Sequence, residues 1–480
     1  MKRFAALFAV IAILAAPAAA SPRSHVTIAQ GTPPGSFELV GHNSLDMRGM
    51  NAAPAVYGDY AYIGSRTDGL HPNSGVYIVN IKDPSNPTTV GQIGTPNEDN
   101  VGETSRELRI WPQQHLLIVE NLGSNCSPEI HECSPTSATV ADNFRFYDIA
   151  GKNAADPKLV SEYKPTNDPH EFYLWVDPHN SKRALMFIST PGGADQLLIT
   201  DISQARQGKF TELGKWRTII PDPATDNRLH SISISPDGKT GYVSYLGGGF
   251  FMVDTSDFAL GKPKPEVRLI TPILNRAHWG DPGTHSAIPI PQSHYVLTTD
   301  EVYGRAIAAI SSGGGCPWGW MRTIDVKDPT HPKVVAEYKL PQNDPAYCSD
   351  NTQNTPDRDY LSSWSSHNPT ALPNLAFITW HSGGLQAVDL SDPTHPAQAA
   401  VFTPTPEPVV VTEDPALSEG HDKVVMWSYP IIQNGLIYVV DVRNGLYILR
   451  YKGPSDSEVS STHFLEGNSN LGDAVRYFKP

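Results

Sequence analysis

Long apolar segments are scarce in this sequence of 480 residues. Beyond residue 20, none reaches the roughly 20 apolar residues that a helix needs to cross a bilayer. Basic side chains are also few, because 36 Lys and Arg stand against 50 Asp and Glu and give a formal net charge of −14. This acidic balance argues against nucleic acid or an anionic membrane surface as a partner.

The short motifs of several enzyme classes are missing as well. The sequence has no G-x-S-x-G nucleophile elbow, no H-E-x-x-H zinc motif, no phosphate-binding P-loop and no EF-hand calcium loop. Sequence motifs therefore leave open whether the protein is an enzyme.

Cysteine is rare, and the four that are present form no C-x-x-C pair, which disfavours a zinc site made of thiolates. Cys126 and Cys133 lie in one polar segment, while Cys316 and Cys348 flank one repeat. In an oxidising compartment such cysteines are expected to pair. We predict the disulfides Cys126–Cys133 and Cys316–Cys348, although four cysteines allow three connectivities.

The first 20 residues have the features of a secretory signal peptide. Lys2 and Arg3 precede an apolar stretch over residues 4–16, and small residues at 18–20 form a cleavage site before Ser21. Ser21 stands where a lipoprotein would have cysteine, so a lipid anchor is not expected. We therefore expect an extracytoplasmic protein, periplasmic or secreted, that is cleaved near Ala20.

One β-hairpin pattern recurs along the whole chain. Its clearest copy, residues 321–339, is an apolar strand ending in Asp325, a Pro-rich turn and a second strand rich in Val and aromatic residues. Two further strands precede each hairpin, as in residues 230–245, which predicts four-stranded antiparallel units. The repeated Asp, interpreted as a turn cap before Pro, or its substitute returns every 53 to 71 residues, at Asn80, Asp148, Asp201, Asp254, Asp325, Asp389 and Arg450.

Seven such units predict an all-β fold, a seven-bladed β-propeller of four-stranded antiparallel blades. The last unit lacks a clear fourth strand, whereas residues 37–42 resemble the fourth strand of other units and precede the first one. We therefore predict that this N-terminal strand docks on the last blade and closes the ring. The expected organisation is a signal peptide (1–20), an N-terminal segment (21–36), the propeller (37–452) and a polar C-terminal tail (453–480).

Loop lengths indicate which end of the propeller carries function. In antiparallel blades, the connections between second and third strands share one end with the connections between blades. Several of these are long and hold all four cysteines, whereas the turns at the other end are short, as at residues 236–238. Long loops on a rigid scaffold are the usual place for binding sites.

The strand at residues 76–80, followed by Asp-Pro-x-x-Pro, resembles the repeat of the LVIVD family of exported β-propellers. The same turn follows Asp325 and Asp389, while the other units lack it. The resemblance implies the propeller fold and an extracytoplasmic location, but no settled reaction. A weaker resemblance to the selenium-binding, methanethiol-oxidase type of propeller, a metal-dependent enzyme, carries no residue over to this chain.

Histidines recur at the start of the predicted innermost strands, which places them around the upper mouth of the central channel. The candidate metal ligands, from four consecutive units, are His170, His230, His285 and His367. The candidate ligand-binding residues expected at the same mouth are Arg106, Glu107, Glu171, Glu301, His381, Trp427 and Arg443.

Three interpretations of these histidines remain open. Imidazoles and carboxylates can bind copper, zinc or iron, and a metal with an open coordination position can activate water or oxygen, as in an oxidoreductase or hydrolase. Alternatively, the polar mouth binds a small molecule, a peptide, a surface polymer or a partner protein without metal. In the third interpretation, the histidines only support strands and loops through hydrogen bonds.

Overall fold

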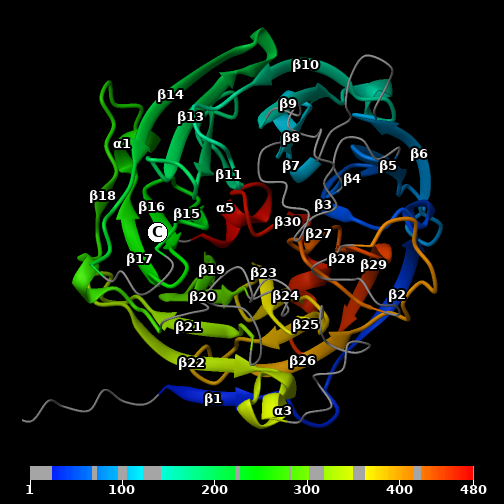
Figure 1. Ribbon diagram of the computed structural model, residues 1–480. Coiled ribbons are helices and arrows are strands. Elements are labelled where there is room, and N and C mark those ends of the chain that lie inside the picture. The colour runs from blue at the N-terminus through cyan, green and yellow to red at the C-terminus, as the bar shows by residue number, and fades with distance from the viewer. Residues whose placement is uncertain are drawn as a thin grey trace, which may run out of the picture.

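The strands form seven sheets that surround a central channel in chain order (Figure 1). The computed structural model describes residues 24–66, 73–95, 105–122, 142–221, 227–279, 283–301, 318–349, 363–413 and 423–478. Each sheet has four antiparallel strands that follow one another outward from the channel, and two sheets carry one further strand. The predicted seven-bladed propeller is confirmed.

The strand bounds follow the repeats. Blades 1 to 3 contain β3 (Asn51–Tyr57), β4 (Tyr60–Ser65), β5 (Val76–Asn80) and β6 (Thr88–Ile93); β7 (Ser105–Trp111), β8 (Leu116–Asn121), β9 (Asn143–Asp148) and β10 (Lys158–Tyr163); and β11 (Glu171–Val176), β12 (Ala184–Ser189), β13 (Leu197–Gln204) and β14 (Lys209–Trp216). Blades 4 and 5 contain β15 (Ser231–Ile234), β16 (Thr240–Ser244), β17 (Phe250–Asp254) and β18 (Arg268–Leu269); and β19 (Thr284–Pro289), β20 (Tyr295–Asp300), β21 (Met321–Asp325) and β22 (Lys333–Lys339). Blades 6 and 7 contain β23 (Ser366–Ala371), β24 (Leu375–Trp380), β25 (Gly384–Asp389) and β26 (Ala397–Phe402); and β27 (Ile431–Gln433), β28 (Leu436–Asp441), β29 (Gly445–Lys452) and β2 (Ser36–Asn43).

Helices are short and lie in the connections. They are α1 (Ser256–Ala259), α3 (Pro345–Ser349), α4 (Asp456–Ser460) and α5 (Asp473–Tyr477), with 3₁₀ turns η1 (Leu45–Met47), η2 (Pro112–Gln114), η4 (Gly151–Ala154), η5 (Ala205–Gln207), η6 (Ile273–Asn275) and η7 (Pro341–Asn343). Among the described residues, no helix has both the length and the apolar character needed to cross a bilayer.

Side chains of each innermost strand pack alternately against the two neighbouring blades. In β11, Phe172 and Leu174 pack in one cluster with side chains of blade 2, whereas Tyr173 and Trp175 pack in another with side chains of blade 4. Successive residues of a strand point to opposite faces, so one strand can serve both interfaces. The core is therefore divided into layers between the blades, and the channel is lined by the edges of the innermost strands.

The repeated Asp is a turn cap, as predicted. Asn80, Asp325 and Asp389 each accept a hydrogen bond from the backbone N–H two residues later, at 2.9, 2.8 and 2.8 Å. This local bond holds the chain in the Pro-rich turn that follows. The repeat motif is thus a structural device away from the channel.

The ring closes as expected from the sequence. β2 pairs antiparallel with β29 as the outermost strand of blade 7. The Phe37 ring of β2 lies 5.9 Å from that of Phe377 and 5.6 Å from that of Tyr451. The beginning of the propeller therefore covers the edge of its last blade.

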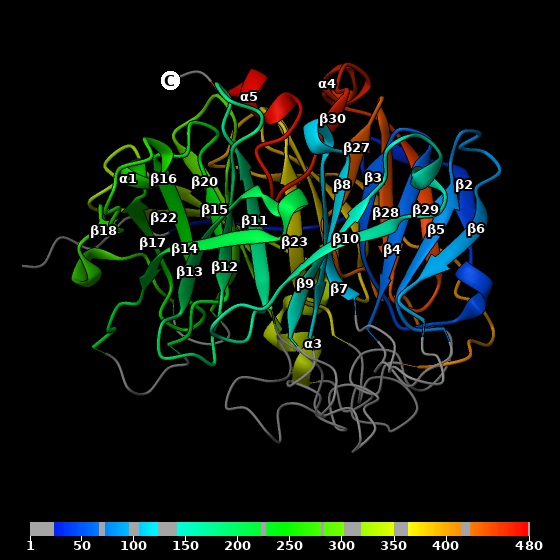
Figure 2. The same ribbon diagram turned by 90° about the horizontal axis from the view of Figure 1, so that it is seen from above.

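Both ends of the described chain add structure beyond the four-stranded blades. β1 (His25–Ile28) pairs parallel with β22 on the outer edge of blade 5, and β30 (Phe464–Leu465) pairs with β27 on the inner edge of blade 7. We call residues 456–478 the C-terminal segment. It contains α4, β30 and α5, which lie together at one end of the ring, opposite α3 (Figure 2).

Asn470 fixes the C-terminal segment across the channel to blade 3. Its side chain accepts a hydrogen bond from the Val176 N–H at 2.8 Å and donates one to the Val176 carbonyl at 2.7 Å. A polar side chain of this segment therefore hydrogen-bonds to the backbone at the end of a strand. Hydropathy alone does not reveal such a role.

The disulfide and signal-peptide predictions concern residues that lie largely outside the part of the chain that the structure describes. Cys126, Cys133 and Cys316 lie outside the described residues, as do the side chain of Cys348 and residues 1–20. The two disulfides and the cleavage site remain predictions.

Two carboxyl groups face each other inside blade 2. Glu107 of β7 lies opposite Glu120 of β8, and both are at most 1% exposed. Glu107 forms an ion pair with Arg109 at 2.9 Å, whereas the Glu120 carboxylate has no hydrogen-bond partner among the described residues. Burial, followed by the charge of Glu107, raises the pKa of Glu120 well above its usual value.

A Glu120→Gln variant should therefore be more stable than the wild type at pH 8, by about 1–3 kcal/mol, and this gap should shrink toward pH 5. The folded protein keeps a proton that the unfolded chain releases above about pH 4.3, so stability falls as pH rises toward the folded pKa. Urea unfolding from pH 5 to 8 measures the gap, with exposed Glu38→Gln as the control. A stability difference between variant and wild type that does not change with pH would contradict the raised pKa of Glu120.

Candidate metal centre

Four histidines meet at the end of the channel opposite the C-terminal segment. His170 and His230 immediately precede β11 and β15, while His285 and His367 are the second residues of β19 and β23. Their ring centroids follow one another at 4.5, 3.9 and 4.0 Å. The sequence-based expectation that equivalent positions of four blades bring these rings together agrees with this placement.

Glu301 and His381 complete the group. The Glu301 carboxylate, which follows β20, lies 2.9 Å from Nε2 of His367 and 3.5 Å from Nε2 of His285. Its distances to Nε2 of His230 and His381 are 3.7 and 4.0 Å. We call His170, His230, His285, His367, His381 and Glu301 the His–Glu cluster.

Outward contacts orient three of these rings. Nδ1 of His285 lies 2.7 Å from the Ser286 hydroxyl, and Nδ1 of His381 lies 3.1 Å from the Ser363 hydroxyl. Nδ1 of His367 is within hydrogen-bond distance of the Trp427 carbonyl. Holding one ring nitrogen in this way directs the other toward a common centre, which is how metal-binding histidines are oriented in proteins.

The His367 contacts require a cation at Nε2. A carbonyl only accepts hydrogen bonds, so Nδ1 of His367 carries the proton that it donates to Trp427. In neutral His367, Nε2 would then present a lone pair to the Glu301 oxygen 2.9 Å away. Because two acceptors at that distance repel each other, a second ring proton or a metal ion must satisfy both.

A similar pairing joins His170 and His230, whose Nε2 atoms are 2.9 Å apart. Two nitrogens at this distance share either a proton or a metal ion, since two lone pairs repel. The contact extends the group of inward-facing nitrogens to the innermost strands of blades 3 and 4.

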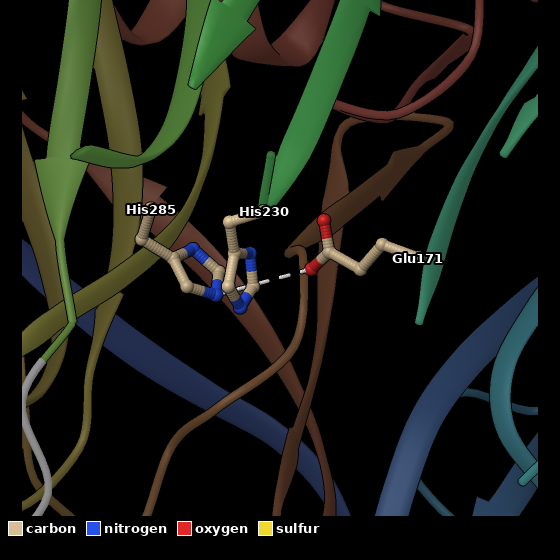
Figure 3. Close-up of side chains that lie close together, drawn as sticks. All are labelled: Glu171, His230 and His285. Carbon is tan, nitrogen blue, oxygen red and sulfur yellow. Dashed lines mark ion pairs between the residues drawn. The ribbon is translucent and has the colours of Figure 1, made fainter. Parts of the chain in front are cut away.

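Two sets of three residues have the spacing of metal ligands. One set is Glu171, His230 and His285 (Figure 3), and the other is His285, Glu301 and His367; within each set the ligand atoms lie within 4.8 Å of one another. In Figure 3, the Glu171 carboxylate points toward the imidazoles from β11, and its distance to Nε2 of His285 is 4.0 Å. Both sets use His285, which therefore occupies the middle of the site.

Burial sets the protonation of these groups. Burial, followed by the neighbouring His230, lowers the pKa of both His170 and His285 well below the usual value, and burial lowers the pKa of His381 to about 3. These imidazoles are therefore neutral near pH 7, the form that binds metals.

The two carboxyl groups behave differently. Burial opposes ionisation of Glu301, but the imidazoles, His367 first, outweigh it and hold its pKa well below the usual range. Burial, followed by the charge of Glu107, raises the pKa of Glu171 well above its usual value, so Glu171 holds a proton.

The other sequence-predicted site residues divide into two groups. Trp427 lies beside the site, with its ring 5.2 Å from that of His367, and the Arg106 guanidinium lies 5.3 Å from the Trp427 ring. Glu107 instead pairs with Arg109, and Arg443 pairs with Glu413 at 2.9 Å. The ligand-binding role assigned to all four stays a prediction.

Sequence reasoning missed the residues that support the rings. Ser286 directly follows His285 and could have been suspected from that position, whereas Ser363 and the Trp427 carbonyl come from connections whose course the repeat does not determine. Sequence reasoning also missed Arg66, whose guanidinium carbon lies over the face of the Trp427 ring, 4.8 Å from the ring centroid.

The fold and the site together define a seven-bladed β-propeller with a buried cluster of imidazoles and carboxylates at one end of its channel. Residues 50–95 and 372–403 match the family model of the LVIVD repeat, which confirms the resemblance in blade 1 and blade 6. No curated protein matches the chain.

The chain is similar to two solved structures, among others. The β-propeller domain of Cps50 (Swd1) from Myceliophteria thermophila is 11% identical, with 87% of this chain and 99% of that chain covered and a TM-score of 0.46. Sqt1 from Chaetomium thermophilum is 10% identical, with 87% and 100% covered and a TM-score of 0.49. Likenesses at this level carry no argument about function.

Proposed function

We propose that the His–Glu cluster binds one transition-metal ion, with His285, Glu301 and His367 as its central ligands and His170 and His230 beside them. The supporting observation is the 2.9 Å contact between Glu301 and Nε2 of His367, two acceptors that a metal ion would satisfy together. A mixed set of imidazole and carboxylate ligands suits zinc, iron or copper.

The chemistry of such a site would depend on both the ion and the chain. A bound metal supplies a Lewis acid that polarises water or a substrate oxygen. The serine and carbonyl contacts keep the ring nitrogens directed inward, and burial excludes bulk water. Glu171 holds a proton on its carboxyl group, 4.0 Å from Nε2 of His285, where it can be passed to a bound substrate. We propose on these grounds that the site is the functional centre of the protein.

Metal content tests the proposal. We expect about one equivalent of zinc, iron or copper in the isolated wild type and less than about a tenth in a His230→Ala, His285→Ala double variant, since removing two ligands abolishes tight binding. The matched control is His331→Ala with His395→Ala, because both of these histidines are more than half exposed in Pro-rich turns.

Protein for this measurement should come from the exported fraction, because we also propose that the chain acts outside the cytoplasm. Its mass then reports whether it begins at Ser21. A wild type that is folded and free of metal after growth and after incubation with each of the three ions would contradict the metal proposal and favour a mouth that binds a ligand without metal.

A further inference from the structure

A cavity of about 470 Å³ lies at the end of the channel opposite the His–Glu cluster. Its walls come from Tyr173 of β11, Tyr242 of β16, the short turns that contain Pro236 and Pro291, and the C-terminal segment. Its volume lies within the range of small-molecule sites. The cavity is thus separate from the proposed metal centre, and the C-terminal segment forms one of its walls.

Three buried ionisable side chains line this cavity, Glu466, Tyr173 and Tyr242. Glu466 is 4% exposed, and its carboxylate accepts a hydrogen bond from the Ser469 hydroxyl at 2.6 Å. Tyr173 and Tyr242 are 5% and 9% exposed. In the part of the chain that the structure describes, neither phenol hydroxyl makes a hydrogen bond, although buried hydroxyls in proteins nearly always do. The cavity therefore offers hydrogen-bonding capacity that the protein itself does not use.

The charge of the cavity excludes one class of ligand. Of the described residues along its walls, none is Lys, Arg or His, and Glu466 is the only acidic one. The buried cation Arg109, whose charge acts on Glu466, is engaged by Glu107 at 2.9 Å and by the Phe172 carbonyl at 3.3 Å. Burial outweighs this charge and raises the pKa of Glu466 above its usual value. A carboxylate or phosphate would find no cationic partner among these residues, whereas an ammonium group could pair with Glu466.

Other parts of the walls are apolar. Ile234 and Ile288 come from the innermost strands of blades 4 and 5, and Leu465 and Phe478 come from the C-terminal segment. Such walls can bury a ring or a short hydrocarbon chain, and the removal of this apolar surface from water favours binding. The ligand that matches all of these features has one positive end and an apolar body.

We propose that this cavity binds a small organic amine, whose ammonium group pairs with Glu466 and whose ring or short aliphatic body packs against the apolar wall. The Tyr173 and Tyr242 hydroxyls supply hydrogen bonds to polar groups on that body. This site is distinct from the proposed metal centre, because the two lie at opposite ends of the channel.

Three probes with the same phenol ring separate charge from shape. Calorimetric titration of the full mature protein with tyramine, 4-ethylphenol and 4-hydroxyphenylacetate compares a cation, a neutral molecule and an anion. We expect tyramine to bind at least about 10-fold more tightly than 4-ethylphenol, and the anion not to bind. Equal binding of the cation and the neutral probe, or no binding of tyramine up to about 10 mM, would overturn the proposal.

Variants then place the binding site. Glu466→Gln should weaken tyramine binding about 10- to 100-fold, because it removes the charged partner of the ammonium group. Tyr242→Phe, which removes only a hydroxyl, should weaken it about 3- to 10-fold, and it decides the matter if Glu466→Gln fails to fold. Glu38→Gln, an exposed carboxyl on β2, is the matched control. Unchanged affinity in folded Glu466→Gln or in Tyr242→Phe would assign tyramine to another site.

Discussion

A chain that lacks residues 24–43 should not remain folded and monomeric. Without β2, the outer edge of β29 loses its antiparallel partner, and Phe37 no longer packs against Phe377 and Tyr451. An exposed strand edge invites pairing with another chain. We expect the midpoint of thermal unfolding to fall by more than about 10 °C and the protein to aggregate, as measured by calorimetry and by gel filtration with light scattering.

The matched control removes residues 24–32 only. This change deletes β1, which adds to the outside of blade 5 and leaves the seven four-stranded blades intact. The shorter deletion should lower the unfolding midpoint by only a few degrees, since the ring still closes. If both deletions had the same small effect, closure by β2 would not be what holds the ring together.

Glu301→Gln should lower the affinity for the bound metal about 100-fold or more, which corresponds to about 2.7 kcal/mol. The substitution keeps the size of the side chain but removes the negative charge that lies within 4.0 Å of four imidazoles. Competition with a chelator of known affinity, followed by metal analysis, measures the change.

Glu171→Gln is the informative comparison, because the two carboxyl groups belong to the two alternative ligand sets that share His285. Glu171 is protonated and lies 4.0 Å from its nearest imidazole nitrogen. We therefore expect less than about a 10-fold loss of affinity for Glu171→Gln. The reverse order of effects would place the ion between Glu171, His230 and His285.

Much of the fold was predictable because each repeat has both a pattern and a boundary. Asp325 and Asp389 end their strands with a side-chain bond to the backbone and are followed by Pro, so seven units could be counted and the missing strand assigned to residues 37–42. The positions of β1 and β30 were not predictable, because two or four residues with no repeat partner give no signal of which distant edge they will join.

The site was predictable only for residues that occupy equivalent positions in the repeated blades. His170, His230, His285 and His367 occupy equivalent positions in consecutive blades, so the ring geometry alone places them side by side. Glu301 was expected near the mouth, but its central position between the imidazoles depends on the path of the chain after β20. Ser363 and the Trp427 carbonyl lie in connections without internal repetition, and only the folded chain shows that they orient the rings.

The closure of the ring also has a consequence for the order of events during biosynthesis. Contacts such as that between Nε2 of His42 and the Asn444 carbonyl, at 2.8 Å, join residues 402 positions apart. While the nascent chain is still attached to the ribosome, β2 has been made but its pairing partner β29 has not. The ring therefore stays open until most of the chain has been synthesised. The propeller can therefore complete its fold only after its last blade has been synthesised.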